Sequence, residues 1–387
     1  MPDLFETLNL TGYNLESYYT SIISASLEDL NVVDLPKPEI LELIKPQDYA
    51  KISADLFIKL DDQTLTTLLK WPLSIDTSMT EMGMCHVLNS NVAVFDDPTK
   101  WSDSTVAYAK KNIELSLHDI DYFVQIVNYA EAYKVYTLSP DEVILSGAAS
   151  LTFDTEGFLS FGVQITSTRA SEDIKYIPLH LRKCRFYYET TSKRYSIYSY
   201  NRCLLECRIN MILKLCGCIP HFYKPLDSER ICSLAELECV FEYKREILKL
   251  SASNDTMEKF GNTNDIPRSF RECGCLGNCE EDVFTNDHET FLPQETMNRL
   301  SVSVSAFPKV RVKREIIFSF SDFFRKLIFS VNWQYSLSLL LGQTWIKISV
   351  LFRYFSEPDM SLKYDFCGKW RHTYNMYSHS TNKSFIS

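Results

Sequence analysis

The chain has 387 residues, of which 45% are hydrophobic and 23% charged, and its formal net charge is −10. This length allows one large domain or two ordinary ones, and the composition is that of a globular protein, not a disordered one. The acidic balance argues against a nucleic-acid partner, because such proteins usually present a basic face. Two interpretations of the acidity stay open: solubility, or a surface that attracts cations.

The first 130 residues are predicted to be mostly helical. Apolar residues recur at intervals of three and four in segments 17–30 and 55–71, which is the period of an amphipathic helix. Segment 1–13 has neither a basic start nor an apolar stretch, so it predicts no signal peptide. We therefore expect either that the start of the protein is missing from this sequence or that export is directed from elsewhere.

Short strands are predicted after residue 130. Segments 133–138 (YKVYTL) and 162–166 (GVQIT) have strand composition, and the first runs into the turn signal SPDE. Segment 299–307 (RLSVSVSAF) alternates apolar and polar residues, as in a strand with one buried face. Three N-x-S/T sequons, at Asn9, Asn254 and Asn382, mildly favour a secretory route, and Asn9 and Asn254 are the glycosylation candidates.

Ten of the twelve cysteines lie within one hundred residues, and only Cys85 and Cys367 lie outside this block. The ten are Cys184, Cys203, Cys207, Cys216, Cys218, Cys232, Cys239, Cys273, Cys275 and Cys279. A zinc site would need C-x₂₋₄-C pairs that converge on one point, and the two C-x-C pairs fit this poorly. A catalytic thiol is less consistent still, because neighbouring cysteines would oxidise it.

Disulfides explain the spacing more directly. A helix is predicted over 202–216, and on it Cys203 and Cys207 project from one face about 6 Å apart along the axis. On an extended backbone Cys273 and Cys275 project about 6.6–6.8 Å apart. Two parallel disulfides could therefore join this helix to a strand, although many other pairings of ten cysteines stay open.

The segment Leu327–Ile346 is twenty residues long and has no formal charge. As a helix it would be about 30 Å long, which matches the hydrocarbon core of a bilayer. It contains Asn332, Gln334 and Gln343, and its aromatic residues lie inside the segment and not at the ends. A membrane helix and a buried or interfacial helix are the two interpretations.

The cysteine block resembles a known family. Segment 184–225, followed by ICSLAELEC and CGCLGNC, is similar to the thumb region of the epithelial sodium channel/degenerin family, and is most like its pickpocket-like branch. Segment 80–90 (TEMGMCHVLNS) resembles the family motif T-x-x-G-x-C-Y-T-F-N, with Cys85 and Asn89 at matched positions. The resemblance covers roughly residues 75–324.

The resemblance implies an α+β fold, with a large disulfide-rich extracellular domain that has a central β-sheet palm, a helical finger and a helical thumb. It implies the nested pairs Cys184–Cys279, Cys203–Cys275, Cys207–Cys273, Cys216–Cys239 and Cys218–Cys232. The family pairs the position of Cys85 with a cysteine on an earlier strand that has no counterpart in this sequence, so we expect Cys85, like Cys367, to be unpaired. The expected parts are 1–130 (finger-like), 131–183 (palm-like strands), 184–280 (stapled thumb), 281–324 (strand returning toward the membrane), 325–350 (candidate second membrane helix) and 351–387 (unrecognised tail).

The function implied is that of a subunit of a trimeric, ligand- or stimulus-gated, amiloride-sensitive type of sodium channel that conducts sodium passively across the plasma membrane, with most of the chain outside the cell. The implied partners are sodium ions, related subunits in a homo- or hetero-trimer, and membrane lipid. No catalytic residue, metal site or cofactor is predicted. The alternative is a non-conducting binding or regulatory ectodomain from an incomplete gene model.

The pore region departs from the family pattern. The nearest equivalent of the selectivity filter is Gly342, Gln343 and Thr344, and Lys347 follows where the family has an acidic residue. Three lysines around a narrow pore would repel sodium ions. The first membrane helix of the family has no counterpart in this sequence, so we expect the chain expressed alone to give no sodium current.

Overall fold

The structure is a computed structural model. It describes residues 12–28, 44–58, 65–67, 74–103, 105–110, 123–127, 133–153, 157–260, 266–293, 299–306 and 311–315. The chain divides into two compact units. The first comprises Met1–Thr168 and Leu179–Lys309, and the second comprises Arg169–Pro178 and Val310–Ser387.

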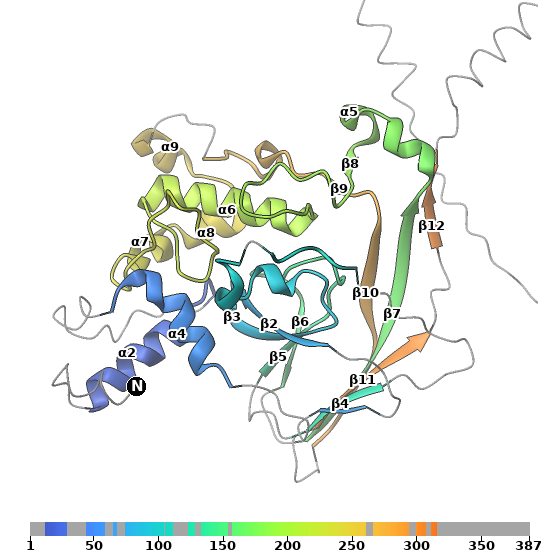
Figure 1. Cartoon of the computed structure of the whole chain (residues 1–387), viewed down its shortest axis with the longest axis horizontal. Helices are drawn as coiled ribbons and strands as arrows, with labels where there is room; N and C mark the ends of the chain where they lie inside the picture. The colour runs from blue at the N-terminus through green and yellow to red at the C-terminus, as the bar shows by residue number, and fades with distance from the viewer. Residues whose placement is uncertain are drawn as a thin grey trace, which may run out of the picture. The chain divides into compact units, whose positions relative to one another are not determined.

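The first unit contains a block of helices. They are α2 (Gly12–Ser24), α4 (Tyr49–Leu56), α6 (Tyr200–Cys216), α7 (Leu237–Glu242), α8 (Lys244–Lys249) and α9 (Asn254–Phe260). Figure 1 shows α6 beside α7, α8 and α9, with α2 and α4 packed nearby. One hydrophobic core joins them, and Ile22 of α2, Ile209 and Ile212 of α6, and Ile247 of α8 are fully buried in it. Burial of this shared core is the main force that holds the short helices together.

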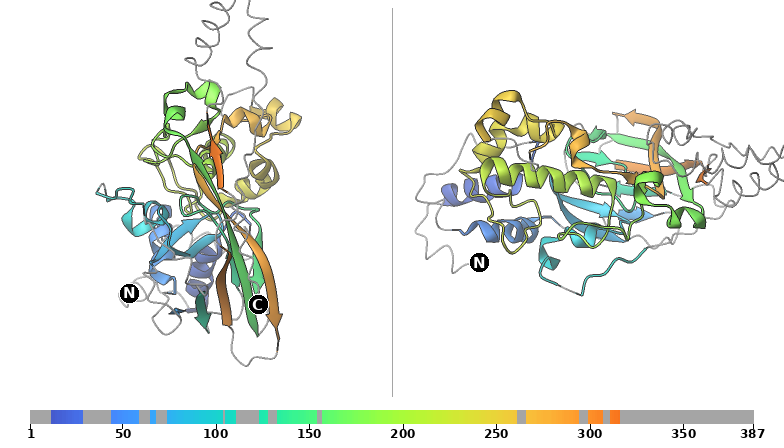
Figure 2. Two further views of the ribbon diagram at one scale, coloured as in Figure 1. Left: turned by 90° about the vertical axis from the view of Figure 1, so that its right-hand side faces the viewer. Right: turned by 90° about the horizontal axis from the view of Figure 1, so that it is seen from above.

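A sheet forms the second part of this unit. Its order is β1 (Leu65–Thr67), β4 (Phe123–Val127), β11 (Arg299–Ala306), β7 (Phe158–Ala170) and β10 (Glu281–Leu292). Strand β11 runs parallel to β7 and antiparallel to β4, and Figure 2 shows β7 and β10 twisting about each other. Alternate residues Leu159, Phe161 and Val163 of β7 are buried with Leu300 of β11. The alternating residues Arg299–Ala306 therefore form a strand, as predicted.

Three small strand pairs connect these parts. They are β2 (Ile75–Thr80) with β3 (Gly83–Leu88), β5 (Tyr133–Tyr136) with β6 (Ser150–Phe153), and β8 (Cys184–Arg185) with β9 (Gly277–Asn278). The last pair is parallel. The chain enters the helical segment from β8 and leaves it through β9, so this pair fixes both ends of residues 186–276.

The remaining elements are short. Turns of 3₁₀ helix lie at Pro46–Asp48, Ala93–Phe95, Pro98–Lys100, Glu172–Tyr176 and Phe270–Cys273, and α5 spans Leu179–Arg182. Within the second unit, the amide of Ser171 donates to the carbonyl of Arg314, the last residue of β12 (Arg311–Arg314).

One helix prediction is wrong. Segment 55–71 has helical periodicity, but α4 ends at Leu56 and residues Leu65–Thr67 form the strand β1. These residues pair in register with Val124–Ile126 of β4. Pairing with a distant strand overrides the local pattern here, and the two threonines suit a strand better than a helix.

Several sequence predictions lie outside the described residues. They are the segment Leu327–Ile346, the residues Gly342, Gln343 and Thr344, the cysteine Cys367, and the sequons at Asn9 and Asn382. Within the described ranges, no helix has both the length and the apolar character that crossing a membrane requires.

Candidate functional site

Helix α6 is the element on which the candidate site is built. The hydroxyl of Ser199 caps its start by accepting a hydrogen bond from the amide of Arg202. Gly217 ends the helix in a left-handed conformation with φ of 70°, and its amide donates to the carbonyl of Leu213. The helix has 17 residues, which makes it about 25 Å long. Its ends are thus fixed by local bonds before any tertiary contact is counted.

Two disulfides hold one side of α6. Cys203 is bonded to Cys275 and Cys207 to Cys273, with Cα–Cα separations of 5.7 Å and 5.8 Å. Both separations lie in the ordinary range for a disulfide. The partner segment is not the extended strand that we predicted, because a 3₁₀ turn ends at Cys273 and Gly274 has a φ of 65°. Glycine adopts this φ readily, so the chain turns between the two cysteines and both still bond α6.

Three further disulfides lie at or around this helix, and one of them bonds its last residue, Cys216, to Cys239 of α7. They are Cys184–Cys279, Cys216–Cys239 and Cys218–Cys232, with Cα–Cα separations of 4.9, 5.9 and 5.0 Å. The five pairs are the same as those that the family resemblance implies. The disulfide Cys184–Cys279 joins β8 to the residue after β9. It therefore holds the two ends of the helical segment together.

Cys85 is free, and no other cysteine in the described ranges is. It lies in β3 with its sulfur 3.4 Å from the hydroxyl of Thr80. Burial raises the pKa of its thiol, because the thiolate would lose its hydration. A thiol with a raised pKa is a poor nucleophile at neutral pH, so this position does not favour covalent catalysis.

A buried ion pair joins the middle of α6 to the β2–β3 turn. The guanidinium of Arg208 contacts the carboxylate of Glu81, and the two side chains are 7% and 0% exposed. Glu81 also accepts hydrogen bonds from the amide of Ser146 at 2.7 Å and from the hydroxyl of Tyr223 at 2.8 Å. Burial raises the pKa of Glu81, and the charge of Arg208 opposes that shift. One carboxylate therefore links four separate stretches of the chain.

A second buried pair holds the first turn of α6. Arg202 donates to Asp96 at 2.7 Å and to the carbonyl of Val92 at 3.2 Å. Its guanidinium carbon lies 4.2 Å from the ring centroid of Tyr195, a cation–π arrangement. Burial raises the pKa of Asp96, against the influence of Arg202. The arginines bind carboxylates that lie more than one hundred residues earlier in the chain.

Glu142 forms a joint at the N-terminus of α6. Its carboxylate accepts hydrogen bonds from the amides of Tyr200 and Asn201, at 3.2 Å and 3.1 Å, and from the side-chain amide of Asn278 at 2.6 Å. The side chain of Asn278 also accepts from the amide of Tyr200 at 3.0 Å. Burial raises the pKa of Glu142, and these donors oppose the shift. This carboxylate ties the loop after β5 to both α6 and β9.

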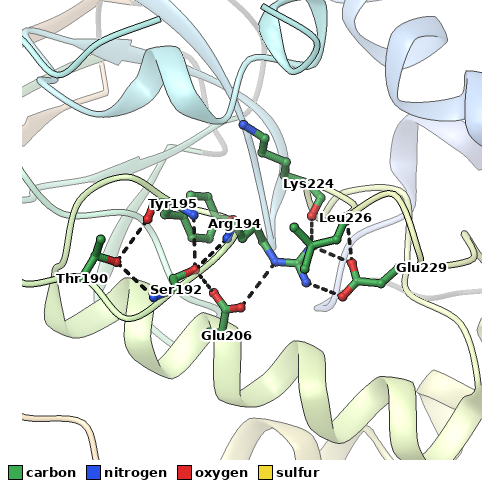
Figure 3. Close-up of polar contacts among 8 residues, drawn as sticks. All are labelled: Thr190, Ser192, Arg194, Tyr195, Glu206, Lys224, Leu226 and Glu229. Carbon is green, nitrogen blue, oxygen red and sulfur yellow. Dashed lines mark hydrogen bonds and ion pairs between the residues drawn. The ribbon is translucent and has the colours of Figure 1, made fainter. Parts of the chain in front are cut away.

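Arg194 fixes the loop that leads into α6, as Figure 3 shows. It donates to both carboxylate oxygens of Glu229, at 2.8 Å and 2.7 Å, and to the carbonyl of Lys224. Its Nε lies 3.9 Å from Glu206 on α6, and Ser192 donates to that same carboxylate. This bidentate contact is the stronger kind of arginine–carboxylate pair, so the loop is held to α6 and to residues 224–229 together.

These contacts make α6 a braced strut. Disulfides hold one part of its surface, and buried ion pairs hold another. Each of the arginines Arg194, Arg202 and Arg208 is paired with a carboxylate, so the charges buried around α6 are compensated.

The sequence profile of the family described as "Amiloride-sensitive sodium channel" matches residues 30–335. The chain belongs to this family. The match includes the cysteine block, α6 and the strands of the sheet. Members of the amiloride-sensitive sodium channel family are ion channels and not enzymes.

Curated relatives in this family are similar over shorter stretches. The sodium channel protein Nach of Drosophila virilis is 30% identical over 99 residues, which are 25% of this chain and 25% of that protein. Nach of Drosophila melanogaster is 31% identical over 98 residues, or 25% and 18% of the two chains. Pickpocket protein 11 of Drosophila melanogaster is 30% identical over 112 residues, or 29% and 18%. Each alignment thus spans a quarter or less of the relative's length.

The sequence did not reveal the buried contacts between arginines and carboxylates around α6. Arg202 and Arg208 lie within an otherwise apolar helical pattern, which was the one available signal that α6 needs buried carboxylates. Nothing in the local sequence identifies Asp96 as the partner of Arg202 or Glu81 as the partner of Arg208. Their roles depend on contacts between distant segments, which periodicity does not reveal.

Proposed function

We propose that the protein is a subunit of a trimeric, stimulus-gated sodium channel in the plasma membrane, with most of the chain outside the cell. It forms homo- or hetero-trimers with related subunits, contacts membrane lipid, and conducts sodium ions passively. Family membership supports this proposal, and the observation that carries it is the covalent and ionic bracing of α6.

The cysteine chemistry supports the extracellular placement. Ten cysteines form five disulfides in the structure, and such dense cross-linking is typical of oxidising compartments. The outermost pair closes a loop with a sequence separation of 95 residues. A loop of this length stabilises the fold by about 4–5 kcal/mol in the chain-entropy model.

The proposed mechanism is the transmission of a displacement. A stimulus moves the helical block, and α6 passes that movement on because its contacts leave little freedom to absorb it. The path runs through the disulfides to Cys273 and Cys275, through β9, and into β10, which begins at Glu281 and pairs along β7. Glu142 holds the start of α6 and β9 together, so both move as one.

A conduction experiment tests this proposal. The chain, joined behind the first membrane segment of a pickpocket relative, is expressed in oocytes and its current recorded under voltage clamp. We expect an amiloride-sensitive sodium current, and a smaller stimulus response when Glu142 is changed to Ala. The proposal is contradicted if the fusion reaches the cell surface with its five disulfides formed and still conducts no sodium.

A further inference from the structure

Asn254 is the one sequon asparagine within the described part of the chain. It is the first residue of α9, and its side chain is exposed together with those of its neighbours Ser253 and Asp255. A bulky hydrophilic group on this side chain would project into solvent without displacing any part of the core.

The third residue of the same sequon is buried. Thr256 is 5% exposed, and its hydroxyl donates to the carboxylate of Glu246 at 2.9 Å and lies 2.9 Å from the hydroxyl of Ser253. The amide of Thr256 also donates to Ser253 at 3.2 Å. The enzyme that attaches N-linked glycans must reach this hydroxyl on an accessible peptide. In the folded protein the hydroxyl is therefore out of reach.

We propose that Asn254 carries an N-linked oligosaccharide, and that it is attached before α9 docks on α8. This inference rests on the proposed extracellular placement, which routes the chain through the secretory pathway. In the transfer step, the amide nitrogen of Asn254 forms a bond to C1 of a polyprenyl-diphosphate-linked oligosaccharide. The C1–oxygen bond breaks, the polyprenyl diphosphate leaves, and the nitrogen gives up one proton.

The timing follows from where Asn254 lies. It falls between Cys207 and Cys273, so the disulfide that joins those cysteines encloses it in a closed loop. Docking of α9 is further fixed by Lys259, whose ammonium donates to the hydroxyl of Tyr243 at 2.7 Å. Folding and glycan transfer therefore compete for the same segment. Slower closure of the loop raises the fraction of Asn254 that is modified.

The first experiment measures occupancy at Asn254 in the full chain. The chain is produced in cultured human cells, treated with PNGase F in ¹⁸O-water, and digested with trypsin to give the peptide Leu250–Lys259. We expect ¹⁸O-labelled Asp at position 254. Asn254→Gln and Thr256→Ala should each lose one glycan, whereas Thr256→Ser, which keeps the hydroxyl, should retain it.

The disulfide state separates the possible failures. An unmodified Asn254 in a protein with all five disulfides formed overturns this inference alone. An unmodified Asn254 in a protein whose ten cysteines are free thiols overturns the proposed extracellular function as well.

A second experiment tests the timing. Cells are given a membrane-permeable reductant during synthesis, which delays closure of the Cys207–Cys273 loop, and occupancy is measured in newly made chains. We expect occupancy at Asn254 to rise relative to that at Asn9, which no disulfide of the cysteine block encloses. Glu246→Gln, which weakens the hold on Thr256, should shift occupancy in the same direction. Unchanged occupancy in both cases would refute attachment before docking.

Discussion

The most informative residues are the buried carboxylates, each of which binds several distant parts of the chain. Glu81 receives donors from α6, from the segment after it and from the loop before β6. Glu142 receives donors from α6 and β9. A buried charge is costly unless its partners are complete, so the loss of one partner has a large effect.

Removing the cation from the Glu81 pair is predicted to be strongly destabilising. Arg208→Met leaves Glu81 buried without its counter-charge, and should lower the free energy of unfolding by about 3–5 kcal/mol. The matched control is Arg230→Met, because Arg230 pairs with Glu236 at the surface, where the two side chains are 55% and 39% exposed. Arg230→Met should lower the free energy of unfolding by at most about 1 kcal/mol. Chemical denaturation of the purified variants measures both values, and equal losses would argue against a special role for Glu81.

The protonation of Glu142 gives a pH-dependent prediction. Burial raises its pKa above the ordinary value of 4.5, so the folded state holds this proton more tightly than the unfolded chain does. The resulting stabilisation is complete below pH 4.5 and is lost as the pH rises through the raised pKa. The stability advantage of the wild type over Glu142→Gln should therefore shrink from pH 4 to pH 7. Thermal unfolding across that range tests it, and an advantage that grows with pH would show that the donors lower the pKa instead.

At the scale of elements, α6 and the strands show what the sequence could and could not predict. Helix α6 and strand β11 follow from local periodicity, because each buries one face against a single core. The structure of segment 55–71 does not follow from its periodicity, because pairing with β4 decides the conformation of Leu65–Thr67. Likewise Cys273 lies in a 3₁₀ turn where we predicted a strand, since the glycine between the cysteines permits a turn.

The five disulfides are predicted to differ in their resistance to reduction. Cys184–Cys279 and Cys218–Cys232 are fully buried, at 0–1% exposure, whereas the other three pairs are partly exposed. A reductant must reach sulfur to attack it, so the three exposed pairs should open first. Partial reduction under native conditions, followed by alkylation and mass mapping, gives the order. Early loss of Cys184–Cys279 would contradict the burial seen in the structure.

In the whole chain, the family match and the contacts that hold α6 fall in the same stretch of sequence. The family profile matches residues 30–335, and within that stretch three of the five disulfides and the buried ion pairs of Arg202 and Arg208 involve α6. The resemblance of the cysteine block to this family was visible in the sequence, because the spacing of the cysteines is local and specific. The ionic contacts of α6 could not, because they join residues more than one hundred positions apart.

The most direct test of the central claim is a disulfide map of the protein recovered from the cell surface. Intact protein is labelled on living cells, isolated, digested without reduction and analysed by mass spectrometry. We predict that all five pairs found in the structure are present, including the two that bond α6 to Cys273 and Cys275. Recovery of these ten cysteines as free thiols, or in other pairings, would contradict it.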